Sequence, residues 1–160
     1  MKHHDITELQ FPLASNEIRL LAELGFMAAA SGQVAAATEI FEALIRLRST
    51  KAFPYVGKAV ALLYVGLFPA AIELLTAATQ VVETHQEQIW IYLALAFQRN
   101  GFEDKARKIL NHLLDSGELN DVDTTFVKAI LKSDRSTDDG LPKPFSLALN
   151  ESSHNLALTM

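Results

Sequence analysis

Three single glycines at nearly equal spacing constrain the fold of this chain more than any other feature. Gly32, Gly66 and Gly101 are separated by 34 and then 35 residues, and each ends an apolar run. The same residue classes recur around them: a large side chain eleven positions before the glycine, a small one seven before it, and alanine five after it. These positions hold Leu21, Tyr55 and Trp90; Gly25, Ala59 and Ala94; and Ala37, Ala71 and Ala106. A repeat of this period predicts an array of similar supersecondary units.

Each unit is predicted to be a helical hairpin. The apolar residues on both sides of each glycine follow helical spacing, and glycine suits the turn because it adopts positive φ without a steric penalty. In the second unit Pro69 falls just inside the second helix, where its missing N–H costs nothing. One hairpin cannot bury its apolar face alone, so the three are expected to stack around a continuous core.

This pattern resembles the tetratricopeptide repeat. The family's motif is matched by Trp90, Leu93, Ala94, Phe97, Gly101, Ala106 and Leu110 in the third unit, and by Leu24, Gly25, Gly32, Ala37 and Phe41 in the first. The second unit departs most, with Lys58 where the family prefers Leu, and no unit has the usual closing proline. The resemblance implies an all-α fold, a right-handed α-solenoid of three stacked hairpins, with units at about 18–51, 52–86 and 87–119.

Both ends of the chain differ from the repeats. A capping helix is predicted over 121–134, with Asn120 or Asp121 as its N-cap, and it completes a helical domain spanning 16–135. Residues 1–15 are predicted to form a short arm that contains Ile6, Leu9 and Phe11 and ends with Ser15 as the cap of the first repeat helix. Residues 136–160, with two prolines and several serines, are predicted to be a flexible tail.

Composition excludes several classes of partner. The net charge of −5 and the lack of Lys/Arg runs argue against nucleic acid. The chain has no cysteine, which excludes a disulfide framework and fits a cytoplasmic location. Neither a secretory signal nor a membrane-spanning stretch is found, so no membrane insertion is expected.

Catalytic and metal-binding patterns are missing from the sequence as well. His85, His112 and His154 stand alone, without the helical spacing of a metal pair, and the glycines do not form a phosphate loop. Asp134, Asp138 and Asp139 lack the alternation and the closing Glu of a calcium loop. We therefore expect no enzyme activity, no metal and no cofactor.

The resemblance to the tetratricopeptide repeat also implies that the first helices of the units line a concave groove, with family-equivalent positions facing into it. The second unit's first helix is apolar around nearly its whole circumference, with Lys58 as its only charge, and a surface helix of that kind predicts a buried or binding face. The predicted partner-binding residues are Phe26, Phe53, Val56, Val60, Leu63, Tyr64, Ile91 and Leu95. The predicted polar rim consists of Arg19, Gln88, Gln98 and Arg99.

Three occupants of this groove remain open. The first is an apolar helix or extended segment of another protein. The second is the chain itself, through the arm or through the tail, whose segment 141–147 contains two prolines and apolar residues. The third is a second copy, which would make the strip a homodimer face.

The length, acidic charge, repeat number and capping helix also resemble the cytoplasmic chaperones of bacterial type III secretion. Those proteins hold an apolar segment of a needle or translocator subunit in their groove, and the resemblance implies the same role here. The rival interpretation is a repeat adaptor or scaffold in another pathway.

Overall fold

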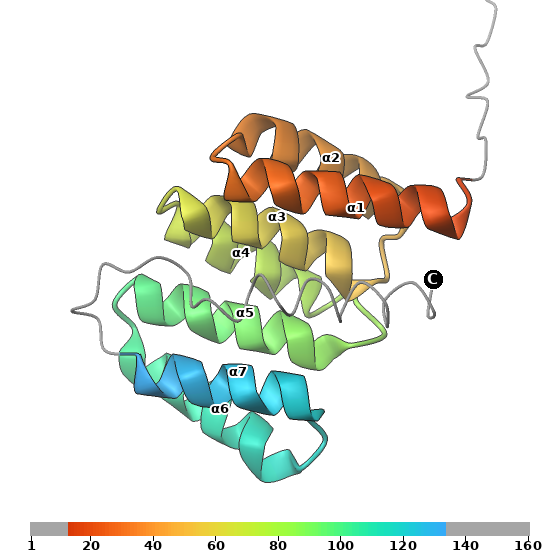
Figure 1. Ribbon diagram of the computed structural model, residues 1–160. Helices are drawn as coiled ribbons and strands as arrows, with labels where there is room; N and C mark the ends of the chain where they lie inside the picture. Colours follow the sequence, from red (N-terminus) through yellow and green to blue (C-terminus); the bar gives the residue numbers. More distant parts are fainter. Residues whose placement is uncertain (1–12, 134–160) are drawn as a thin grey trace, which may run out of the picture.

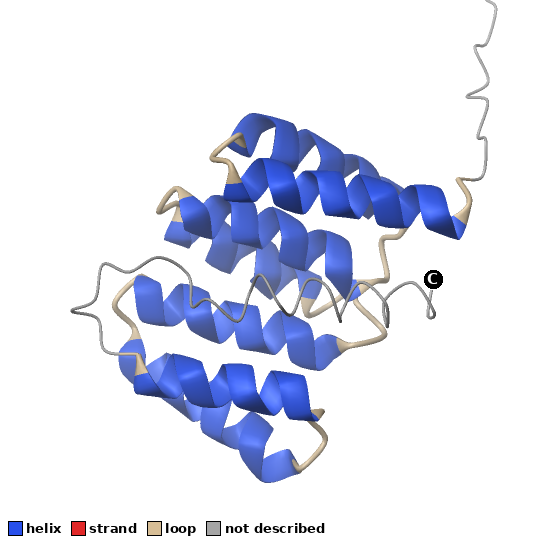
Figure 2. Cartoon of the chain, in the orientation of Figure 1, coloured by secondary structure: helices blue, strands red, loops and turns tan. Residues whose placement is uncertain are grey.

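The fold was determined from a computed structural model that describes residues 13–133. Within this range the chain forms seven helices and no strand, which confirms the predicted all-helical class (Figures 1 and 2). The helices are α1 (Ser15–Ala30), α2 (Val34–Leu47), α3 (Ala52–Tyr64), α4 (Phe68–Ala78), α5 (Gln86–Arg99), α6 (Glu103–Ser116) and α7 (Asp121–Lys132). Most of the predicted arm and the whole tail from residue 136 lie outside the described residues.

The three repeat glycines make the same turn three times. Gly32, Gly66 and Gly101 have φ values of 75°, 74° and 90°. After each glycine, the next backbone N–H bonds to the carbonyl five residues before it: Gln33 to Ala28, Leu67 to Leu62 and Phe102 to Phe97, at 2.8–2.9 Å. This hydrogen bond is the Schellman pattern that closes a helix and reverses the chain.

The hairpins pack in two layers. In Figure 1, α1, α3, α5 and α7 lie in front, and α2, α4 and α6 lie behind them. Every helix contacts the next one along the chain, and the first helices also contact one another, α1 with α3 and α3 with α5. The right-handed solenoid remains a prediction.

Phe41 of α2 sits where two hairpins meet. Its ring is fully buried, and two small residues of the front layer, Gly25 and Gly57, face it. A Cβ at Gly25 would lie 2.8 Å from Phe41 Cζ, and one at Gly57 would overlap the ring. Glycine at both positions therefore lets α1 and α3 approach α2 closely.

α7 closes the far end of the hairpin array. Phe126, Val127 and Ile130 are buried in the main core cluster together with residues of α3, α4, α5 and α6. The side chain of Asn120 accepts a hydrogen bond from the backbone N–H of Asp123, which confirms Asn120 as the N-cap.

The start of α1 differs from the prediction. Ser15 is the first helical residue and Ala14 occupies the N-cap position. Glu17 Oε2 accepts a hydrogen bond from Ala14 N at 2.7 Å. The Glu17 carboxylate thus satisfies the backbone N–H of the N-cap residue, which is the half of a capping box that an alanine N-cap allows.

Candidate functional site

The predicted groove residues all lie on the first helices, but most of them are buried. Phe53, Val56, Val60, Leu63, Ile91 and Leu95 have exposed fractions of 0–6%. Val56, Val60 and Leu63 of α3 share one cluster with Ile91 and Leu95 of α5, and Phe53 belongs to the cluster of the first hairpin. These six side chains are core residues in the structure, and their role in partner binding stays a prediction.

Two predicted groove residues are more accessible. Tyr64, the last residue of α3, is 40% exposed. Phe26 of α1 is half-buried, and its ring meets that of Phe41 edge-on, with centroids 4.9 Å apart. Phe26 packs against both large core clusters, so it joins the first hairpin to the rest of the front layer.

The predicted rim residues do not form one uniform group. Arg19 pairs with Glu23 one helical turn further on, with 3.6 Å between Arg19 Nε and Glu23 Oε1. Gln88 and Arg99 are half-buried at opposite ends of α5. Gln98 differs from the other three, because its side chain is hydrogen-bonded to the end of α7.

Gln98 ties α5 to the last turn of α7. Its Nε2 donates to the carbonyl oxygens of Ile130 and Ser133 at 3.0 and 3.2 Å. In residues 13–133 its Oε1 is a buried acceptor that has no hydrogen-bond partner. Sequence periodicity placed Gln98 at a groove edge and could not reveal this contact, which joins residues more than thirty positions apart.

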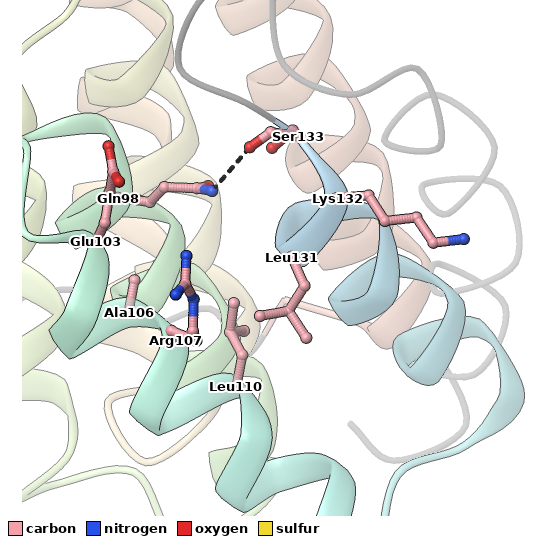
Figure 3. A pocket seen from close by; sticks show the side chains of 8 residues that line it. All are labelled: Gln98, Glu103, Ala106, Arg107, Leu110, Leu131, Lys132 and Ser133. Atoms are coloured by element: carbon pink, nitrogen blue, oxygen red, sulfur yellow. Dashed lines mark hydrogen bonds between the residues drawn. The ribbon is translucent and has the colours of Figure 1, made fainter.

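A cavity of about 270 Å³ opens beside Gln98 (Figure 3). Ala106, Leu110 and Leu131 form its apolar part, and the Arg107 guanidinium points into the space between α6 and α7, whereas Lys132 is directed away from it. The Ser133 hydroxyl donates to the carbonyl of Ile130. The polar part of the lining comes from Gln98, Glu103, Arg107, Lys132 and Ser133.

The start of α7 contains a buried polar contact that the sequence did not predict. Asp123 is buried, and one of its carboxylate oxygens accepts a hydrogen bond of 2.7 Å from Asn120 Nδ2. Burial raises the pKa of Asp123, and nearby Glu87 raises it further, while Asn120 and His85 act in the opposite direction. The neighbouring Tyr92 ring lies 5.6 Å from that of Phe126, and burial raises the pKa of its hydroxyl.

Large apolar side chains are exposed at other places than the predicted groove. They include Leu20, Leu24 and Met27 on α1, and Trp90 of α5, which is 38% exposed. Tyr55 and Trp90 occupy the same position of the repeat, eleven residues before the turn glycine, but they differ in exposure. Tyr55 is buried and its hydroxyl donates to Ser49 O at 2.9 Å, but Trp90 does not follow it into the core.

Within residues 13–133, no group of three or more His, Asp or Glu side chains could hold a metal ion together. The helices of this part of the chain are also too short or too polar to cross a membrane. Comparison with known proteins finds no match to a protein-family model, to a curated protein or to a solved structure.

Proposed function

We propose that this chain is a protein-binding helical-repeat module that acts as a cytoplasmic chaperone. Its client is an apolar segment of a type III secretion subunit, held against the layer of first helices. The predicted groove would then belong to a right-handed solenoid of tetratricopeptide-like hairpins. The proposal includes neither catalysis nor a cofactor.

One observation supports this proposal above the others. Five of the predicted groove residues, three from α3 and two from α5, belong to one buried apolar cluster that also contains residues of α4, α6 and α7. Apolar residues of two neighbouring first helices thus pack together, and this favours an apolar segment as the client. Their burial means that a client would first contact the two accessible side chains, Phe26 and Tyr64.

The energetics allow useful affinity. Burying an apolar side chain contributes about 1.5–3 kcal/mol, and ordering the client offsets much of this gain. A few such side chains would therefore suffice for a complex that forms in the cell and still releases its client.

The test is capture of partners from the native cell lysate by the tagged full chain, with the captured proteins identified by mass spectrometry. A needle or translocator subunit among them supports the chaperone role. Capture of unrelated proteins supports an adaptor instead. A stable dimer that captures nothing indicates an assembly face.

Two variants locate the binding face. Phe26→Ala and Tyr64→Ala should each weaken capture about tenfold, since each loses roughly 1.4 kcal/mol of contact. Phe102→Ala is the matched control, because Phe102 is an exposed aromatic residue in the turn between α5 and α6. Equal loss of capture in all three variants would contradict binding at the front layer.

A further inference from the structure

The outer face of α1 presents an apolar stripe. Leu20, Leu24 and Met27 lie at helical spacing on one side of this helix, and they are 56%, 45% and 65% exposed. The opposite side of α1, with Ile18, Ala22, Gly25 and Ala29, is buried. α1 is therefore apolar on two faces, and only one of them is packed.

The equivalent positions in the other two units are buried, and they indicate the role of this stripe. Adding the repeat spacing of 34 residues to Leu20, Leu24 and Met27 gives Pro54, Lys58 and Ala61, and a further 35 gives Ile89, Leu93 and Ala96. Pro54, Ala61, Ile89, Leu93 and Ala96 are all buried, and Lys58 is half-buried.

In α3 these positions contact the hairpin that comes before. Lys58 Nζ lies 2.8 Å from Glu42 Oε1 of α2. Ala61 shares a buried cluster with Ala29 and Ala37 of the first hairpin. In α5 the equivalent residues belong to the core cluster that also contains Ala71, Leu75 and Ala78 of α4. The stripe on α1 is thus a hairpin-stacking face, and no helix of residues 13–133 covers it.

The chain order points to one occupant. α3 packs against α2 and α5 packs against α4, so in both cases the helix immediately before in the sequence is a neighbour. The connections are short, residues 48–51 and 79–85. Residues 1–12 are joined to α1 by Leu13 and Ala14, and Leu13 already packs against the cluster of the first hairpin.

We propose that residues 1–12 cover the stripe of Leu20, Leu24 and Met27 and so complete the open end of the hairpin array. Their apolar residues, Ile6, Leu9 and Phe11, would replace those that α2 and α4 supply to the later units. The length is sufficient, because Met27 lies about 18 Å along α1 from its start at Ser15, and twelve residues span up to about 40 Å when extended. This end face is separate from the predicted groove, so the proposal does not depend on the client.

The first test uses the lack of cysteine in the chain. In the variant Leu24→Cys, maleimide should label the thiol about tenfold more slowly in the full chain than in a chain that begins at Leu13. Far-ultraviolet circular dichroism and Trp90 fluorescence must be the same in both chains. Equal labelling rates would overturn the proposal.

A second pair of variants keeps the whole chain. Leu9→Glu in the Leu24→Cys background should abolish the protection, because a charge cannot enter an apolar contact without cost. Gln10→Glu is the matched control and should retain it. If both variants label as slowly as the parent, something other than this segment covers the stripe and the proposal fails.

Cross-linking separates the segment from a second copy. Oxidation of Ile6→Cys/Leu24→Cys or of Leu9→Cys/Leu24→Cys should give a disulfide within one chain, which requires Cα atoms about 4.4–6.8 Å apart. Leu9→Cys/Glu118→Cys is the control, because Glu118 is exposed in the connection between α6 and α7. A disulfide-linked dimer of the single variant Leu24→Cys would show that a second copy covers the stripe and would overturn the proposal.

Discussion

The ammonium group of Lys58 lies 2.8 Å from Glu42 Oε1, and this ion pair joins α3 to the hairpin before it. Lys58 stands where the equivalent helices have Leu24 and Leu93. Its side chain is 21% exposed, so the aliphatic part packs between hairpins while the charge reaches the more exposed carboxylate. Lys58 departs from the repeat motif, but it still contributes a contact to the face on which the hairpins stack.

The pair makes stability depend on pH. The hydrogen bond and the charge of Lys58 lower the pKa of Glu42 below its ordinary 4.5. The folded chain therefore holds the proton less tightly than the unfolded chain, and the stabilisation is present above pH 4.5 and lost as the pH falls through the folded value. Glu42→Gln should lower the urea midpoint at neutral pH and have no effect in strong acid. An equal effect at both pH values would contradict this origin.

Gly57→Ala should destabilise the fold by about 1–3 kcal/mol, because the new methyl group overlaps the Phe41 ring in a packed core. Adding Phe41→Leu should recover part of this loss, and urea unfolding of the two single variants and the double variant measures the coupling. Gly32→Ala is the control: it has open space but a φ of 75°, so its cost comes from backbone strain and Phe41→Leu should not reduce it. Additive effects in the Gly57 pair would rule out the steric explanation.

Gln98→Ala should loosen the end of α7. The change removes two hydrogen bonds to the carbonyls of Ile130 and Ser133, at an expected cost of about 1–3 kcal/mol. Hydrogen exchange should become faster in α7 and stay unchanged in α1. Gln88→Ala, the same substitution on the same helix, should change stability by less than about 0.5 kcal/mol. If the two variants behave alike, Gln98 does not anchor α7.

Asp123 should make the fold less stable as the pH rises. Burial raises its folded pKa above the ordinary 3.8, so between these two values the folded chain binds the proton more tightly than the unfolded chain. Above the folded pKa the carboxylate is buried as an ion, which costs free energy. In Asp123→Asn the side-chain oxygen can still accept the hydrogen bond from Asn120. The substitution should therefore change the free energy of unfolding more favourably at neutral pH than in acid.

Urea unfolding of the wild type and Asp123→Asn at about pH 4 and about pH 7 measures this difference. Asp121→Asn, an exposed change in the same helical turn, controls for the loss of a negative charge near the helix N-terminus. Parallel pH profiles of the wild type and Asp123→Asn would contradict the prediction.

The sequence by itself determined the helices and their turns. Gly32, Gly66 and Gly101 lie in the turns with positive φ, and Pro69 is in the first turn of α4, because turn geometry and helix starts depend on local backbone freedom. The period of the repeat also identified the equivalent positions of the three units. Local chemistry of this kind can be recognised without knowing any neighbour.

Only the tertiary structure decided which apolar side chains are accessible. Val60 and Leu95 were predicted to line a groove and are buried, whereas Trp90 and Leu24 are exposed. Periodicity along one helix shows how wide its apolar face is, but the neighbouring helices determine which part of that face is covered. The contact of Gln98 with α7 and the burial of Asp123 likewise arise from segments brought together by folding, and no spacing along the chain indicates them.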